Sequence, residues 1–144
     1  MSGSTRKFFT VSEANAMLPL VRAIAQDLSN VSREVIERNE RLALLREDEH
    51  DEPIAYREEV EQIEDELDKD KQQLQEYINE LIALGVEPKN GVEGLIDFPA
   101  KFEGRTVYLC WKLDEPEVLY WHELDAGFAG RQSLSESAIT GSNN

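Results

Sequence analysis

Residues 14–45 read ANAMLPLVRAIAQDLSNVSREVIERNERLALL, and the spacing of their apolar side chains decides the fold. Apolar residues recur every seven positions in two series that begin three residues apart, which is typical of a long helix with one buried stripe. The two series are Ala14, Val21, Leu28, Val35, Leu42 and Met17, Ile24, Val31, Leu45. Arg38 interrupts the second series, and Pro19 predicts a bend because it removes one helical hydrogen bond.

The start of this helix is marked by the tetrapeptide Thr10-Val11-Ser12-Glu13. It fits a capping box, in which the Thr10 hydroxyl accepts a hydrogen bond from the Glu13 amide while the Glu13 carboxylate accepts one from the Thr10 amide. We therefore expect the helix to begin directly after Thr10.

A second helix with the same heptad pattern follows an acidic connection over residues 47–53. Its apolar positions are Val60, Leu67, Leu74, Leu81 and Tyr56, Ile63, Tyr77, Leu84. Asp70 interrupts this pattern, and Gly85 follows as a helix-ending residue. If the two helices fold back on each other, each apolar residue of the first helix faces one of the second. The numbers of two facing residues add to 102 in one heptad series and to 101 in the other. One register thus satisfies both seams, and in it Arg38 and Asp70 face apolar residues rather than each other.

Several apolar side chains of the two helices lie outside these seams and need another cover. They are Ile36, Leu44, Ile78 and Ile82. We expect a second copy of the chain to provide it, forming a homodimer through a four-helix bundle.

After Gly85 the apolar period changes to two, which predicts a small antiparallel sheet of three strands at residues 95–98, 105–112 and 118–123. A hairpin that pairs Lys112 with Glu117 would place His122 and Cys110 on opposite faces. We expect the helices to cover one face and the C-terminal loop or a partner to cover the other.

The fold class expected is therefore α+β, a long antiparallel two-helix hairpin followed by a small antiparallel three-stranded sheet. We expect the chain to be divided into four parts: a disordered tail at 1–8, a helical hairpin arm at 9–85, a sheet packed at the base of the hairpin at 86–132 and a second disordered tail at 133–144.

The charge balance narrows the classes of partner. The chain has 30 acidic and 15 basic residues, which gives a formal charge of −15. This negative charge argues against binding to nucleic acid or to an anionic membrane. It is compatible with binding to a basic protein. Apolar runs are far shorter than the ~20 residues of a spanning helix, and no secretory signal is recognised. Cys110 is the only cysteine, which is consistent with a reducing compartment, so a cytoplasmic location is expected.

Short motifs at both ends of the chain resemble an uncharacterised prokaryotic family known only as a domain of unknown function. Near the start they are Phe9-Thr10, Glu13-Ala14-Asn15 and Leu18-Pro19. Towards the end they are Asp97-Phe98-Pro99-Ala100, Leu109-Cys110-Trp111, Tyr120-Trp121-His122-Glu123 and Asp125-Ala126-Gly127-Phe128-Ala129-Gly130-Arg131-Gln132. The resemblance runs from about Phe9 to about Gln132 and implies a family relationship without an activity, so no functional residue is carried over from it.

His122 is the most interesting titratable residue, because an imidazole beside carboxylates can act as a general base or a metal ligand. Glu123 and Asp125 are the other candidate catalytic residues. Adjacent strand residues point to opposite faces, so Asp97 or Asp125 suits a site shared with His122 better than Glu123 does. His122, Asp97 and Asp125 are thus weak candidate metal ligands. The alternative, which we favour, is that His122 is a structural residue hydrogen-bonded to a carboxylate or carbonyl.

The loop Gly127-Phe128-Ala129-Gly130-Arg131 offers a second candidate site, in which backbone amides and the Arg131 guanidinium would bind an anion. Asp97, Tyr120 and Arg131 are the candidate ligand-binding residues. The structural alternative, again favoured, pairs Arg131 with Asp97, Glu123 or Asp125. A buried structural role is expected for Cys110, and the strand aromatics, Tyr120 among them, are expected to belong to the core.

These patterns favour a homodimeric binding or interaction protein without catalysis of its own and predict no cofactor. The rival interpretation is a metal-dependent or acid/base, hydrolase-like enzyme around His122 and Arg131, which would use a divalent metal ion.

Overall fold

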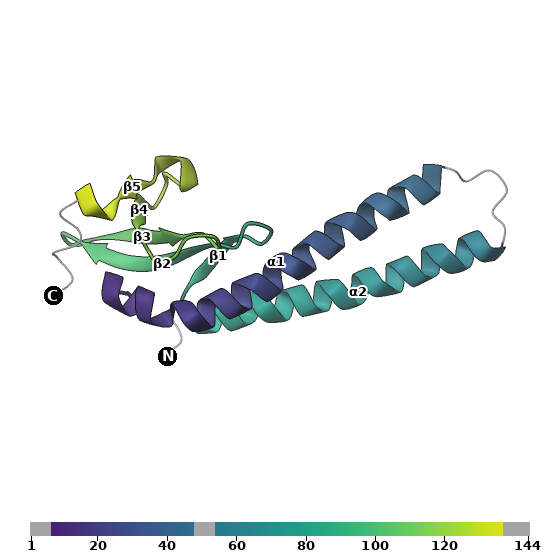
Figure 1. Cartoon of the computed structure of the whole chain (residues 1–144), viewed down its shortest axis with the longest axis horizontal. Coiled ribbons are helices and arrows are strands. Elements are labelled where there is room, and N and C mark those ends of the chain that lie inside the picture. The colour runs from purple at the N-terminus through teal and green to yellow at the C-terminus, as the bar shows by residue number, and fades with distance from the viewer. Residues whose placement is uncertain (1–6, 48–53, 137–144) are drawn as a thin grey trace.

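The computed structural model describes residues 7–47 and 54–136, which form an α+β fold with a projecting arm (Figure 1). The arm consists of helices α1 (Val11–Glu47) and α2 (Ile54–Ala83), which run antiparallel. At ~1.5 Å per residue the helices are about 55 and 45 Å long. The expected acidic connection lies largely outside the described residues. Within the part that is described, no helix is long and apolar enough to cross a membrane.

The sheet has five antiparallel strands in the order β1-β2-β3-β4-β5, so the expectation of three was too low. Its strands are β1 (Glu87–Asn90), β2 (Leu95–Phe102), β3 (Arg105–Trp111), β4 (Tyr120–Glu123) and β5 (Gln132–Ser133). The unexpected strands, β1 and β5, are four and two residues long. Strands this short do not show a clear apolar alternation, and β1 also contains a proline.

Two short 3₁₀ helices complete the described chain, η1 (Phe128–Gly130) and η2 (Leu134–Glu136). Residues 133–136, which were expected to belong to a disordered tail, are instead part of β5 and η2. Ser133 belongs to β5, and Leu134 is buried in the core at 4% exposure. The remaining residues, 137–144, lie outside the described part, as do residues 1–6 of the expected N-terminal tail.

The start of α1 has the predicted capping box. The Thr10 amide donates to Glu13 Oε1 at 2.9 Å, and the Glu13 amide donates to Thr10 Oγ1 at 3.0 Å. Pro19 lies inside α1, which continues through it. The N-terminal, purple part of α1 runs at an angle to the rest of the helix, in agreement with the expected bend (Figure 1).

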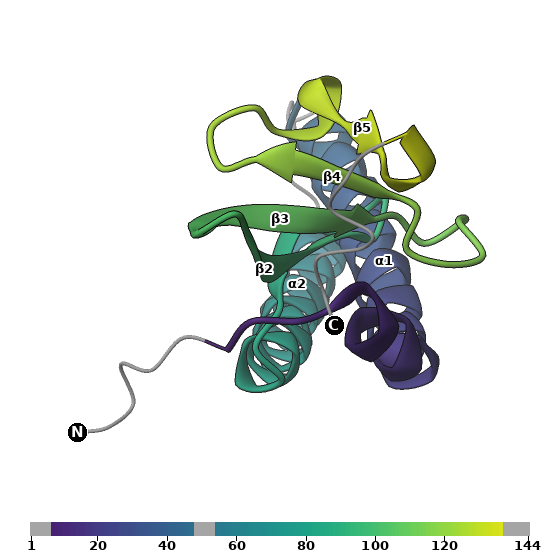
Figure 2. The same cartoon turned by 90° about the vertical axis from the view of Figure 1, so that its left-hand side faces the viewer.

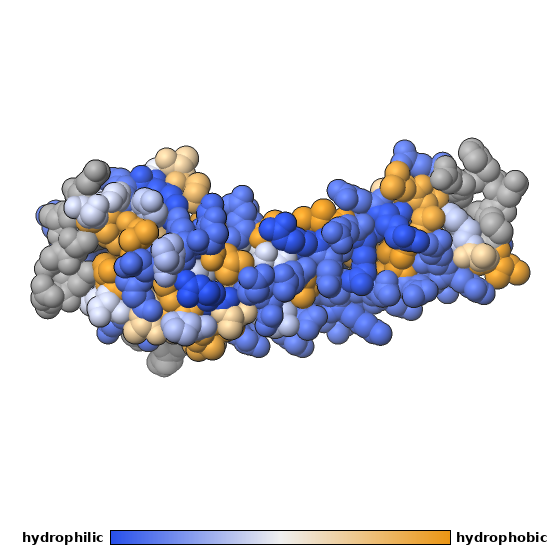
Figure 3. All heavy atoms as spheres, viewed as in Figure 1, coloured by the Kyte–Doolittle hydropathy of each residue, from blue (hydrophilic) through white to orange (hydrophobic). Residues whose placement is uncertain are grey.

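Residues expected in the seam of the hairpin pack together in the arm. Leu28 of α1 and Leu74 of α2 line the same hollow, and Leu42, Ile63 and Leu67 form a second apolar cluster nearer the tip. The heptad stripe thus buries the seam of the hairpin, while hydrophilic residues cover most of the α2 side of the arm (Figure 3).

The expectation that Arg38 and Asp70 do not meet is wrong. The two side chains form an ion pair, and Arg38 also approaches Glu66 at 3.4 Å. In the predicted register Asp70 faces Val31, seven residues or about two helical turns before Arg38. The ion pair therefore joins two residues that this register had placed apart. Arg41 pairs with Glu59 and Arg46 with Glu64 on the outer side of the arm.

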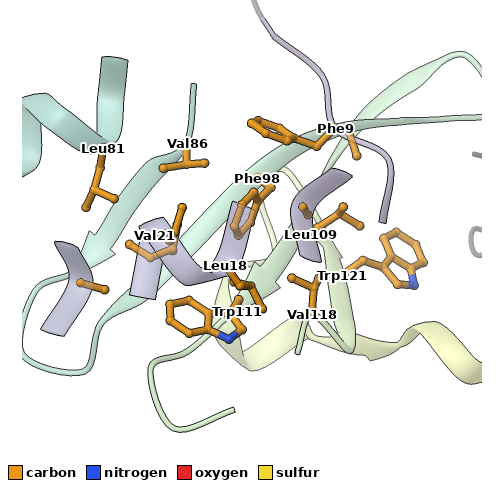
Figure 4. Packing of buried hydrophobic residues seen from close by; sticks show 14 of the residues in the cluster. Phe9, Leu18, Val21, Leu81, Val86, Phe98, Leu109, Trp111, Val118 and Trp121 are labelled. Carbon is orange, nitrogen blue, oxygen red and sulfur yellow. The ribbon is translucent and has the colours of Figure 1, made fainter. Parts of the chain in front are cut away.

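The core lies between the sheet and the helical segments next to it. Leu18 and Val21 of α1 and Leu81 of α2 pack on Phe98 and Leu109, and all five are at most 3% exposed (Figure 4). Both helices lie on the same side of the sheet (Figure 2). This arrangement leaves the opposite, outer face of the sheet to be covered by the chain after β4.

The β3–β4 pairing differs by one residue from the predicted one. Cys110 pairs with Tyr120 and Tyr108 with His122, whereas pairing Lys112 with Glu117 would have put Cys110 opposite Leu119. A slip of one residue exchanges the two faces of a strand. Cys110 and His122 therefore share the outer face, contrary to the expectation.

Candidate functional site

A group of three buried donors lies on the outer face of the sheet. Adjacent strands contribute one residue each, Asp97 from β2, Cys110 from β3 and His122 from β4. Asp97 and Cys110 are directly paired, and His122 lies diagonally across from Cys110, two residues after Tyr120, with which Cys110 pairs. One ligand atom from each residue lies within 4.8 Å of the other two, and each residue is at most 2% exposed. Among the described residues, this is the one group of three such side chains close enough to hold a metal ion.

Both ring nitrogens of His122 have protein partners. Nδ1 lies 2.7 Å from the backbone carbonyl oxygen of Glu123, and Nε2 lies 3.1 and 3.2 Å from the two carboxylate oxygens of Asp97. A carbonyl oxygen can only accept, so Nδ1 carries a hydrogen. One further proton must then lie between Nε2 and the Asp97 carboxylate, because two unprotonated acceptors would repel each other.

Burial changes the proton affinity of both neighbours of His122. It raises the pKa of Asp97 above its ordinary value, although the nearby His122 opposes the shift. Burial, reinforced by the negative charge of Asp97, raises the pKa of the Cys110 thiol to about 12. Cys110 is therefore a neutral thiol at neutral pH, and a cysteine nucleophile requires the thiolate. Cys110 is buried, as expected. Its raised pKa argues against a Cys/His catalytic pair.

A pocket of about 170 Å³ opens above the Asp97–His122 pair. Its other lining residues are Lys89, Leu95, Tyr108, Leu124, Gly127 and Phe128. Lys89 and Tyr108 are joined at the rim through Glu87, whose carboxylate accepts hydrogen bonds from Lys89 Nζ at 3.0 Å and from the Tyr108 hydroxyl at 2.9 Å. Cys110 is fully buried and does not line the pocket. The chain after β4 thus contributes Leu124, Gly127 and Phe128 to the wall of this opening.

Two of the candidate catalytic residues do not reach this site. Glu123 points away from His122 and forms a two-point ion pair with Arg105, at 2.7 and 3.1 Å. This hydrogen-bonded guanidinium lowers the pKa of Glu123. Asp125 is exposed in the turn after β4 and is not part of the donor group. The strand geometry that separated His122 from Glu123 in the sequence is thus present, and Asp97 is the carboxylate brought to His122.

Arg131 is held by the protein itself. Its guanidinium binds both carboxylate oxygens of Glu115 at 2.7 Å and donates to the Cys110 carbonyl at 3.2 Å. The guanidinium carbon lies 4.1 Å from the ring centre of Tyr120 and 4.6 Å from that of Phe128. The expected pairing of Arg131 with Asp97, Glu123 or Asp125 is therefore wrong, because the β3–β4 loop brings Glu115 closer. A guanidinium so engaged is poorly placed to bind an anion.

Sequence reasoning missed Cys110 as a neighbour of His122 because it chose the wrong register. The correct one was nonetheless detectable. Pairing Leu109 with Trp121 collects Tyr108, Cys110, Tyr120 and His122, which carry hydroxyl, thiol and imidazole groups, on a single face. Segregation of polar groups was thus the signal that distinguished the two registers.

The fold and this donor group can be compared with known proteins. Residues 7–134 match a family described as an uncharacterised conserved protein, DUF2203. The chain belongs to the DUF2203 family. The region matched to DUF2203 contains the arm, the sheet and all three donors. The searches of curated proteins and of solved structures gave no match.

Proposed function

We propose that this protein is a metal-binding protein whose site is formed by Asp97, Cys110 and His122. The observation that carries the proposal is the convergence of three buried donors from three strands, with ligand atoms within 4.8 Å of one another. Carboxylate, thiolate and imidazole are the side chains that bind divalent transition metals in proteins. A metal ion would replace the proton between His122 and Asp97.

The hydrogen bonds of His122 favour metal binding over acid/base catalysis. A general base needs a free nitrogen within reach of the substrate, whereas both nitrogens of His122 are engaged and the residue is 2% exposed. A cation placed between Nε2 and the Asp97 carboxylate can use both groups without disturbing the bond at Nδ1. The pair is therefore better suited to hold an ion than to transfer a proton to a substrate.

The surroundings of the donors support the same function. Metal-binding histidines usually donate their second ring N–H to a carbonyl or carboxylate, which fixes the tautomer and the ring plane. His122 has this arrangement through the Glu123 carbonyl. Arg131 in turn holds the carbonyl of Cys110, which restrains the strand at the second ligand.

Thermal unfolding with and without zinc tests the proposal. An ion at a thousand times its dissociation constant stabilises the folded chain by about 4 kcal/mol, which corresponds to a rise in Tm of about 10 °C. His122→Ala should abolish this rise. His50→Ala, a change of the only other histidine, should leave it intact. Equal responses in the two variants, or no response in the unaltered chain, would contradict metal binding at this site.

We also propose that two chains associate through their arms. Ile36, Leu44 and Ile82 remain 46%, 63% and 57% exposed in the single chain, whereas Ile78 packs against the core. Helix α2 carries ten acidic residues against three basic ones, and α1 carries six against five. Repulsion between two α2 helices therefore favours a contact through α1.

Sedimentation equilibrium at micromolar concentration tests this association. The expected mass is twice the chain mass of 16.4 kDa, and Ile36→Glu together with Leu44→Glu should return it to that of one chain. A single-chain mass for the unaltered protein would rule out the dimer.

A further inference from the structure

We infer that the bound ion is of the zinc class, held by one thiolate, one imidazole and one carboxylate, and that its fourth coordination position opens into the pocket above the sheet. This inference rests on the proposed metal binding and adds the ligand set and the open position. Such a site can bind and activate a small exogenous ligand, which a closed structural site cannot do.

The chemistry of the donors selects the ion. Magnesium and calcium bind six to eight oxygen ligands, whereas Asp97 is the only carboxylate in the donor group. A thiolate and an imidazole instead favour zinc and its neighbours among the transition metals. The buried position of all three donors also disfavours a strongly hydrated ion, which would have to lose its water.

The placement of the pocket determines where the open position lies. Zinc sites are usually tetrahedral, so three protein donors leave one position vacant. Asp97 and His122 line the pocket, while Cys110 is fully buried and does not line it. An ion held by all three would therefore face the pocket on the side of Asp97 and His122, and its open position would lie there.

The size and lining of the pocket limit what can bind there. A volume of about 170 Å³ corresponds to roughly five or six waters at ~30 Å³ each, which is enough for a small ligand. Leu95, Leu124 and Phe128 form apolar walls, and Lys89 supplies a cation at the rim. A water or a small anion fits these surroundings.

Charge and protons balance in this arrangement. Binding displaces the thiol proton of Cys110 and the proton shared by Asp97 and His122, so two protons leave for each divalent ion. The two negative ligands then neutralise the ion while the imidazole remains neutral. The buried site thus carries no net charge, which avoids the cost of leaving a charge in the protein interior.

Cobalt(II) in place of zinc, followed by absorption spectroscopy, tests the inference on the full chain. We expect the intense visible bands of a four-coordinate ion and a near-ultraviolet sulfur-to-cobalt charge-transfer band. Cys110→Ser should lose the charge-transfer band. Added azide should shift the visible bands in a saturable manner, because it replaces the ligand at the open position.

X-ray absorption on the unaltered protein with zinc provides the same ligand count without a variant that could misfold. One sulfur at about 2.3 Å and nitrogen or oxygen neighbours at about 2.0 Å are expected. Absence of cobalt and zinc binding would overturn the proposed function itself. Binding without a sulfur neighbour would overturn the ligand set alone, and a sulfur-bound ion whose spectrum ignores azide would overturn the open position alone.

Discussion

Leu18→Ala is expected to lower the free energy of unfolding by about 3 kcal/mol, because it removes a fully packed side chain and leaves a cavity. Leu18 is 3% exposed and lies where α1 crosses the sheet, among Val21, Leu109 and Trp111 (Figure 4). The destabilisation has two parts, the smaller apolar surface that folding removes from water and the weaker dispersion attraction around the cavity. Urea unfolding followed by circular dichroism measures the change.

Leu20→Ala provides the matched control, two residues further along the same helix. Leu20 is 51% exposed, so the same substitution should change the free energy of unfolding by less than about 0.5 kcal/mol. Both variants lose the same atoms and flank Pro19, so helix propensity and the proline cancel in the comparison. Equal losses would show that α1 is not oriented on the sheet as described.

Arg38→Leu is expected to destabilise the arm by about 2 kcal/mol, because it leaves the Asp70 carboxylate without its cation in a nearly dry seam. Asp70 is 8% exposed, and its hydrogen bond to Arg38 raises the pKa of the guanidinium above its ordinary value. Amide hydrogen exchange in α1 and α2 is the suitable measurement, because the arm can open without unfolding of the sheet.

Two further variants separate the buried pair from ordinary surface charge. Arg41→Leu removes the partner of Glu59, where the arginine side chain is 64% exposed, and should cost no more than about 0.5 kcal/mol. Arg38→Leu combined with Asp70→Leu should recover most of the stability lost in the single variant, since an apolar pair fits the seam. Failure of the double variant to recover would mean that the Arg38–Asp70 pair itself contributes a net stabilisation.

The arm was predictable because its evidence is local and repeated. A heptad pattern over two helices contains many independent positions, and the requirement that both seams share one register leaves few alternatives. The capping box at Thr10 and Glu13 is likewise a short-range signal, and it is present as expected. The error about Arg38 and Asp70 arose because a heptad pattern places backbone positions and does not show how far a long arginine side chain reaches.

The sheet was less accessible, since its short strands carry little periodic signal. The existence of β2, β3 and β4 could be recognised from alternating residues, but β1 and β5 could not. The β3–β4 pairing depended on a loop whose length the sequence left open by one residue. This shift of one residue in the register placed Cys110 and His122 on opposite faces in the prediction, whereas in the structure they lie on the same face.

Residues 10–84 contain enough repeated, local information to specify a folded-back pair of helices before any coordinates are known. The donor group could not be specified in the same way, because Asp97, Cys110 and His122 come from three strands and meet only when two registers are both correct. The partner of Arg131 is a similar case, since Glu115 reaches it through a folded loop. Helical periodicity depends on residues that are close in the sequence. Contacts between strands depend on how the strands pair, and a shift of one residue in this pairing moves every side chain of the strand to the other face of the sheet.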